Sequence, residues 1–323
     1  MWPTHRERVL SALDHEETDR VPYNFGGAHP DAYAALLDYL GFAAGPPGAP
    51  IPSERVLRRF DDDVRRVSLR EPHGGSSAGP GVDTYVDEWG VTHRRAHHRA
   101  PFMCVRGPLQ HLAGPSPRDL DSIPWPDPAD PVRTAGLGEQ IARLRQETDC
   151  AIVLRLSNGP FAVAQRLRGF TELLEDLLVN PGFAQALLER LTDVLCAIAA
   201  SALAEMGDQV DCVRFADDMG MQTQPYMSRG LYRRAVKPHH ARYVHALRRK
   251  TGARVILHSD GAVSDLIPDF IDIGIDVLDP VQVGAAGMRP ERLKREFGSD
   301  ICFWGAIDVQ AVLPFGSPAD VAR

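Results

Sequence analysis

Residues 254–280 read RVILHSDGAVSDLIPDFIDIGIDVLDP, and this stretch decides the fold. It opens with a short run of branched apolar residues at 254–258, continues with a helical pattern over about 262–273, and closes with a second apolar run at 276–278. Two short strands joined by a helix form a parallel β-α-β unit, because parallel strands need a crossover connection between them. The stretch therefore predicts an α/β fold with a parallel sheet.

The same alternation extends to both sides of this unit. Further strands are predicted at 20–25, 151–156, 211–215 and 301–304, and further helices at 4–14, 133–148, 170–179, 182–206, 228–250 and 290–297. Polar residues follow the strands directly, as at the C-terminal ends of barrel strands. No G-x-G-x-x-G follows an early strand, which argues against a dinucleotide-binding open sheet. We expect a (β/α)8 TIM-barrel type fold, incomplete at its C-terminus if only about six strands are present.

One segment departs from this alternation. Within 82–95, Tyr85, Trp89 and Val91 follow a pattern typical of a β-hairpin, and the following stretch to residue 131 is rich in turn-forming residues. We therefore expect a single barrel domain over 1–323, with an N-terminal hairpin and loop insertion at about 80–130.

Composition excludes several classes of function. The chain has 323 residues, a net charge of −7, and no apolar run of the roughly 20 residues that a membrane span needs. This charge gives no general attraction to nucleic acids or anionic membranes. Its N-terminal residues lack the apolar core of a signal peptide, and its five cysteines form no C-x-x-C pair. We expect a cytoplasmic protein that binds neither nucleic acid nor membrane and has no disulfide framework.

The first candidate site is the pair His258 and Asp260, which lies at the end of the strand at 254–258. Residues two positions apart in an extended segment point to the same side, so both could face one substrate or one metal ion. Imidazole and carboxylate suit zinc, or a harder divalent ion such as iron or manganese. The alternative is that Asp260 caps the following helix while His258 bonds a neighbouring carbonyl.

A second set of polar residues follows the other strands. Asp217 and Asp218 are adjacent and should point to opposite sides, so that one faces the pocket as a general base or a further ligand; the alternative is a helix cap or an ion pair with Arg214. Single polar residues at strand ends are candidates for substrate contact, and Trp304 is either core or an aromatic wall for a planar ligand. The strand-end candidates are Asn158, Gln282 and Asp308.

Several short motifs, in this order along the chain, carry a resemblance to a known family. They are Arg6-Glu7-Arg8-Val9-Leu10, Asp19-Arg20-Val21-Pro22, Asn158-Gly159-Pro160-Phe161, Phe215-Ala216-Asp217-Asp218-Met219-Gly220, Lys237-Pro238, His258-Ser259-Asp260-Gly261, Leu266-Ile267-Pro268-Asp269, Asp279-Pro280-Val281-Gln282 and Phe303-Trp304-Gly305-Ala306-Ile307-Asp308. Through them the chain resembles the uroporphyrinogen decarboxylase superfamily, and within it the cobalamin:coenzyme M methyltransferase-like branch. The resemblance implies a barrel enzyme that acts on a small molecule.

Two departures from the family pattern bear on the reaction. The methyltransferases carry His-x-Cys after a barrel strand and a later cysteine, which bind zinc, whereas Asp260 stands at the cysteine position here. The decarboxylases carry an arginine-rich N-terminal motif that grips porphyrin carboxylates, and residues 23–27 contain no such motif.

Three functions follow as hypotheses. The first is metal-dependent methyl transfer, in which His258 and Asp260 hold the metal. The methyl donor or acceptor is then a corrinoid, which a separate corrinoid protein could carry, or a small molecule. The second is a metal-free decarboxylase or lyase that acts on a tetrapyrrole or another carboxylated substrate, with Asp217 or Asp260 stabilising a protonated intermediate. The third is a non-catalytic paralogue that binds a tetrapyrrole or corrinoid. A homodimer is compatible with all three.

Overall fold

A computed structural model of the chain describes residues 3–43, 45, 52–72, 83–97 and 100–322. Its strands are β1 (Val64–Ser68), β2 (Thr84–Val86), β3 (Thr92–Arg94), β4 (Met103–Arg106), β5 (Ala151–Asn158), β6 (Cys212–Ala216), β7 (Arg254–His258), β8 (Val277–Val281) and β9 (Cys302–Gly305). Its α-helices are α1 (His5–Leu13), α2 (Pro30–Tyr39), α3 (Glu54–Arg59), α4 (Leu137–Glu147), α5 (Pro160–Arg168), α6 (Phe170–Val179), α7 (Pro181–Met206), α8 (Arg229–Ala235), α9 (Lys237–Arg248), α10 (Ile267–Asp272), α11 (Pro290–Phe297), α12 (Val312–Phe315) and α13 (Pro318–Val321). Short 3₁₀ helices are η2 (Pro117–Ser122), η3 (Pro131–Arg133) and η4 (Ser264–Leu266).

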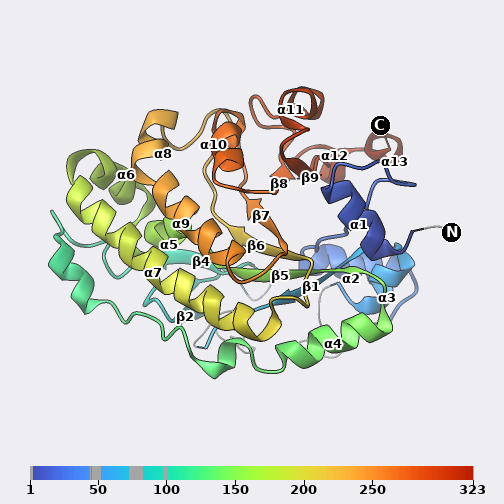
Figure 1. Ribbon diagram of the computed structural model, residues 1–323, viewed down its shortest axis with the longest axis horizontal. Helices are drawn as coiled ribbons and strands as arrows, with labels where there is room; N and C mark the ends of the chain where they lie inside the picture. The colour runs from blue at the N-terminus through green and yellow to red at the C-terminus, as the bar shows by residue number, and fades with distance from the viewer. Residues whose placement is uncertain (1–2, 44, 46–51, 73–82, 98–99, 323) are drawn as a thin grey trace.

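The main sheet is parallel and curled, in the order β1-β5-β6-β7-β8-β9, with helices packed along its outer side (Figure 1). The described part of the chain thus forms six strands of a TIM-barrel-like α/β fold, or half a barrel, and not the eight of a closed barrel. The α/β class and the barrel type predicted from the sequence are confirmed in this form. Parallel pairing brings the C-terminal ends of all six strands to one edge, where a barrel carries its site.

Two apolar layers hold this sheet. The larger lies between its outer face and the helices, where α7 and α9 supply buried side chains such as Leu187, Leu195 and Tyr243. The smaller lies on the inner face, where Val9 and Leu13 of α1 pack against the first inward side chains of the strands. Helix α1 therefore covers the N-terminal end of the half-barrel and leaves the C-terminal end for ligands.

The predicted strand at 20–25 is wrong, and the first strand of the sheet is β1 instead. In place of a ladder, the backbone amides of Tyr23 and Phe25 each donate a 2.6 Å hydrogen bond to a carboxylate, of Asp63 and Asp62 respectively. Buried carboxylates thus satisfy an extended segment that would otherwise need a neighbouring strand.

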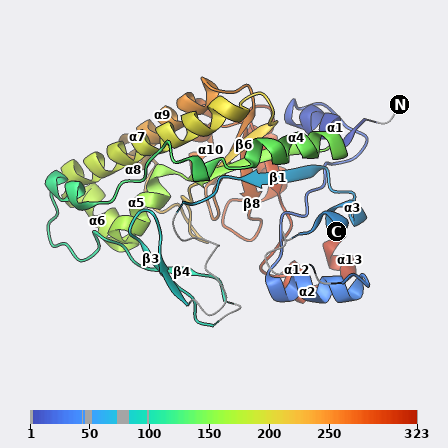
Figure 2. The same ribbon diagram turned by 90° about the horizontal axis from the view of Figure 1, so that it is seen from below.

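The segment from β2 to β4 forms a second, antiparallel sheet, in which β2 pairs with β3 and β3 with β4. It stands on the opposite side of the molecule from α7 and α9 (Figure 2). Residues 80–82 and 98–99 of the expected insertion lie outside the described residues.

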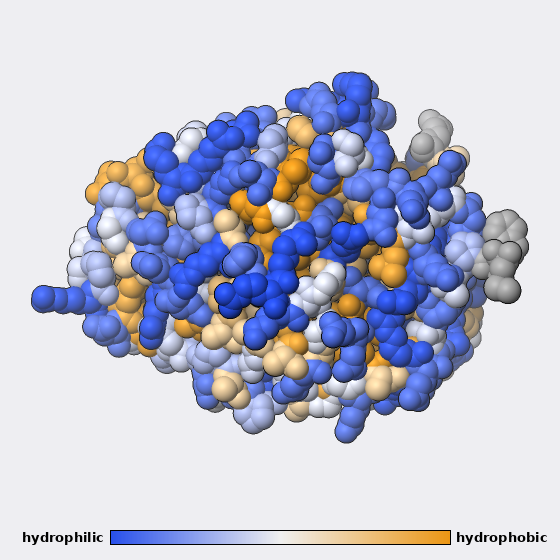
Figure 3. All heavy atoms as spheres, in the orientation of Figure 1, coloured by the Kyte–Doolittle hydropathy of each residue, from blue (hydrophilic) through white to orange (hydrophobic). Residues whose placement is uncertain are grey.

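The outer surface varies in character from one end to the other. Helix α6 leaves Leu178 and Val179 exposed, and hydrophobic residues gather at that end of the molecule (Figure 3). Helix α11 buries only Leu293 and shows a hydrophilic surface in the same view. Among the described residues, no helix has both the length and the apolar character that a membrane crossing requires.

The single helix predicted at 228–250 is divided at Val236 into α8 and α9, and Pro238, which lacks a backbone N–H, stands in the first turn of α9. The basic residues of this segment are not all solvated, because Arg229, Arg233 and Lys237 converge on the buried carboxylate of Asp269 at 2.5–2.7 Å. Burial alone would raise the pKa of Asp269, but these three cations lower it to about 2. The cluster therefore ties α8 and α9 to α10.

We expect Asp269→Asn to lower the free energy of unfolding by about 2 kcal/mol at pH 7. This value follows from the lowering of the Asp269 pKa from 3.8 to about 2, because a pKa shift on folding measures how much the folded state stabilises the charged form. Because the folded pKa lies below the unfolded one, this stability is present above about pH 4 and is lost as the pH falls towards 2. Urea unfolding of both proteins at pH 7 and in acid measures the difference. Asp272→Asn is the control, since Asp272 also contacts Lys237 but is exposed. Equal losses in the two variants would contradict the role of the buried cluster.

Candidate functional site

The inner face of the half-barrel carries a charged layer directly above the apolar one. Side chains alternate between the two faces of a strand, so the residue two positions after each inner apolar residue also faces inward. The inner apolar layer includes Val64, Val153, Cys212, Ile256, Val277 and Cys302. Two positions further on stand Arg66, Arg155, Arg214, His258, Asp279 and Trp304.

An irregularity in β5 turns Asn158 inward. The pairing of β5 with β6 shifts after Arg155, so that Asn158 stands opposite Ala216, in the inward row of β6. The intervening Ser157 instead interacts with Tyr243 in the helical layer. The predicted substrate-contact residue Asn158 therefore lies level with His258, which is the neighbour of Ala216 on β7.

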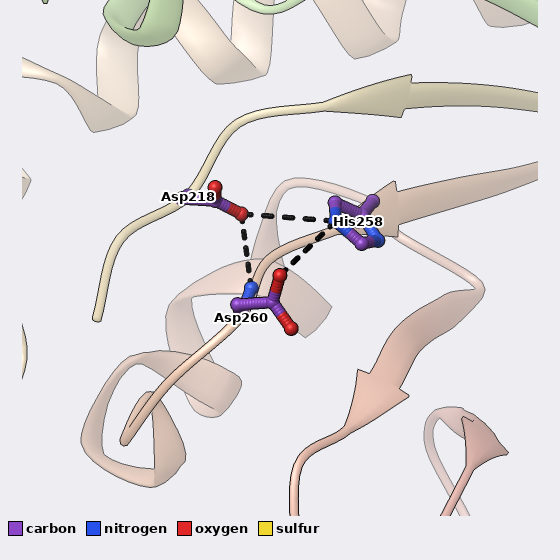
Figure 4. Close-up of side chains that lie close together, drawn as sticks. All are labelled: Asp218, His258 and Asp260. Atoms are coloured by element: carbon purple, nitrogen blue, oxygen red, sulfur yellow. Dashed lines mark hydrogen bonds and ion pairs between the residues drawn. The ribbon is translucent and has the colours of Figure 1, made fainter. Parts of the chain in front are cut away.

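Three potential ligand groups meet at the ends of β6 and β7 (Figure 4). His258 Nε2 lies 3.4 Å from Asp260 Oδ2 and 3.9 Å from Asp218 Oδ1, and Asp218 Oδ1 accepts a 3.0 Å hydrogen bond from the backbone amide of Asp260. One ligand atom from each residue lies within 4.8 Å of the other two. The structure thus brings together three of the four residues proposed as catalytic.

The two loops that present Asp218 and Asp260 are locked together by close backbone contact. Gly261 has a φ of +88°, and a Cβ there would lie 2.4 Å from the backbone of Gly220. Ser259 Oγ accepts a 2.9 Å hydrogen bond from the amide of Met219. These contacts fix the backbone of Asp218 and the backbone of Asp260 relative to each other.

A chain of charges orients His258. Arg214 Nε donates a 2.7 Å hydrogen bond to Asp279 Oδ2, and the same oxygen lies 3.5 Å from the buried Nδ1 of His258. Burial alone would lower the pKa of His258, but the carboxylates of Asp260 and Asp279 outweigh it and raise the pKa to about 9. Burial raises the pKa of Asp218, despite the hydrogen bond from the Asp260 amide.

This donor set fits a divalent metal ion. With Asp279 facing the Nδ1 side of the ring, Nε2 of His258 faces the two carboxylates, the arrangement in which an outer carboxylate fixes the ring of a metal-bound histidine. One imidazole and two carboxylates suit zinc, iron or manganese. The side chains of Asp218 and Asp260 are about half exposed, 45% and 50%, so a substrate could approach an ion between them.

Asp217, the fourth proposed catalytic residue, lies on the other side of the backbone and has no exposed surface. Its carboxylate accepts hydrogen bonds from the amides of Phe161 and Ala162 at the start of α5, and lies 2.9 Å from His240 Nε2. It therefore caps α5 from a distant strand, which was the alternative that the sequence left open.

The remaining predicted substrate residues have different surroundings. Trp304 belongs to the inner charged layer, packed against the apolar layer below it. Gln282 holds the backbone next to Asp260, because its Oε1 accepts a 2.8 Å hydrogen bond from the amide of Gly261. Asp308 caps its own exposed turn through the amides of Gln310 and Ala311.

Several residues of the site were not predicted from the sequence. Arg66, Arg155 and Arg214 share the inner layer with His258, and Tyr226 lies near the two carboxylates. Burial raises the pKa of Tyr226, and the charges of Asp218 and Asp260 add to this effect. An arginine two positions after an inner apolar residue on each of three strands was the available signal, but it depends on knowing which strands pair.

Comparison with known proteins places this geometry in context. The family model described as uroporphyrinogen decarboxylase (URO-D) matches residues 106–323. No curated protein matches the chain. A solved methyltransferase from Methanosarcina mazei superposes with a TM-score of 0.59 at 18% identity, over 92% of this chain and 81% of that one. A β-glucosidase mutant derived from a hyperthermophilic tetrameric structure reaches only 0.31 at 11% identity, over 68% of this chain and 50% of that one, which is too low for the folds to be compared.

Proposed function

Because the chain belongs to the uroporphyrinogen decarboxylase family, we propose that it is a metal-dependent enzyme of that family whose reaction is methyl transfer. His258, Asp260 and Asp218 would hold the ion. When bound, a divalent metal supplies a Lewis acid that activates a nucleophile or a substrate heteroatom. Asp218 extends the two-residue ligand set that the sequence indicates.

One observation carries the proposal. An imidazole nitrogen and two carboxylate oxygens lie within 4.8 Å of one another at the C-terminal ends of parallel strands. The chain's own residues would do the rest. Asp279, 3.5 Å from His258 Nδ1, would orient the imidazole so that Nε2 faces the ion. Asn158 and Trp304 would contact the substrate from the inner face. The apolar layer beneath would exclude water from below.

A corrinoid is the methyl donor or acceptor in this proposal, bound directly or carried by a separate corrinoid protein. The family resemblance of the sequence motifs supports this choice. The replacement of a thiolate by Asp260 gives a harder ligand set, so the activated group need not be a thiol.

Elemental analysis of the full chain, purified without chelator, tests the metal. We expect about one equivalent of zinc, iron or manganese, with more than tenfold weaker binding in Asp260→Ala, because a ligand is lost. Asp308→Ala is the matched control, since its carboxylate only caps an exposed turn. Folded protein that takes up none of these metals would rule the metal mechanism out. Loss of methylcobalamin absorbance on adding a thiol or another acceptor then tests the methyl transfer.

A decarboxylase or lyase without metal is the second candidate. The observation that favours it is the presence of Arg155 and Arg214 on the inner face beside His258, where a substrate carboxylate could be held. Metal content separates it from the first candidate.

A further inference from the structure

Three arginines on adjacent strands share the inner face of the half-barrel. Arg155 of β5 and Arg214 of β6 are direct partners in the parallel pairing, and Arg66 of β1 stands next to β5, opposite Val153. Neighbouring strands lie about 4.8 Å apart, so guanidinium groups on the same side of adjacent strands are close enough to repel. Burial lowers the pKa of Arg66, and the charges of Arg214 and Arg155 lower it further, against the opposing charge of Asp279.

The charges in this layer are not balanced. Arg214 is paired with Asp279. Arg66 donates only to neutral oxygens, of Gly26 and Asn24, and its buried Nε has no hydrogen-bond partner among the described residues. Two guanidinium groups of the layer therefore have no carboxylate of their own.

Of the three arginines, Arg155 gives the clearest indication of a ligand site. Its side chain makes no hydrogen bond or ion pair to any described part of the chain, and the residue is exposed although it lies on the inner face. A structural arginine on a strand would be expected to pair with an acid or a carbonyl. A guanidinium on the inner face that has no partner among the described residues, one strand from Arg214 and two from His258, is placed to receive a ligand.

We propose that Arg155 and Arg214, with Arg66 adding charge, bind an oxyanion group of the substrate, a carboxylate or a phosphate. The guanidinium fork matches both groups through paired hydrogen bonds, and a bound anion would remove the repulsion between neighbouring arginines. The inference deepens the proposed function and rests on it in one respect, that the reacting part of the substrate lies at Asp218, His258 and Asp260. The anionic part would then lie on β5 and β6.

Isothermal titration calorimetry of the full chain at low ionic strength tests this, with succinate and inorganic phosphate as probes. We expect saturable binding of at least one probe, weakened at least tenfold in Arg155→Gln. Arg289→Gln removes the same charge from an exposed position and should leave the affinity unchanged. Arg155→Lys keeps the positive charge but loses the paired donors of the guanidinium group, so it should bind the probe with intermediate affinity. The probe that binds with the higher affinity, succinate or phosphate, indicates whether the site prefers a carboxylate or a phosphate.

Absence of saturable binding by both probes would overturn the inference, and so would equal affinities in Arg155→Gln and Arg289→Gln. Titrations run before and after removal of metal by a chelator keep this outcome separate from the proposed function. Arginine-dependent binding in metal-free protein supports the inference even if the metal mechanism fails. Metal uptake without anion binding would refute only the inference.

Discussion

Replacing Gly159 with alanine should lower the free energy of unfolding by about 3–5 kcal/mol, the range for disrupting a buried charged network. A Cβ at this position would lie 2.2 Å from Oδ2 of Asp217. That carboxylate is buried and holds two amides at the start of α5 together with His240, so it cannot move aside without leaving these partners unsatisfied. The added methyl group thus displaces the cap, the helix, or both.

Chemical unfolding followed by circular dichroism measures this effect. Gly182→Ala is the matched control, because no atom lies within 4 Å of a Cβ at that position in α7, and alanine is favoured over glycine in a helix. Its stability should be unchanged or slightly higher. A loss below about 1 kcal/mol in Gly159→Ala, well under the range for such networks, would mean that Asp217 is not held against α5 as described.

His258→Ala should weaken metal binding by more than 100-fold, beyond the 10- to 100-fold that loss of an outer partner of a ligand costs. The side chain supplies the nitrogen of the proposed ligand set, and its Nε2 lies near both carboxylates. Without it, Asp218 and Asp260 would be left as two like charges with no imidazole beside them. Competition with a coloured zinc indicator, on folded protein of each variant, measures the affinity.

Asp279→Asn is the comparison variant for this second prediction, because its effect on metal affinity should be smaller than that of His258→Ala. Asp279 does not belong to the ligand set but faces Nδ1 of His258 at 3.5 Å, so its loss should cost 10- to 100-fold. The expected order of affinity is wild type, Asp279→Asn, His258→Ala. If His258→Ala bound zinc as tightly as wild type, the assigned metal site would be wrong.

Local sequence patterns were sufficient for much of the fold. The strands near 151, 212, 254, 277 and 302 and most of the helices between them follow from apolar periodicity, which reports which face of an element is buried; α5 (Pro160–Arg168) is the helix that the sequence analysis does not predict. The error at 20–25 has a tertiary cause, since the carboxylates of Asp62 and Asp63 take the backbone amides that a strand would have paired.

The sequence by itself determined the α/β class and placed His258 and Asp260 together at a strand end, because positions two residues apart are related by local geometry alone. Only the tertiary structure decided that Asp218 joins them while Asp217 caps α5, and that an irregularity in β5 turns Asn158 inward. It alone assembled Arg66, Arg155 and Arg214 into one layer. The physical reason is that neighbours across a sheet depend on strand order and register, which are set by the packing of the whole chain and not by the residues of any one strand.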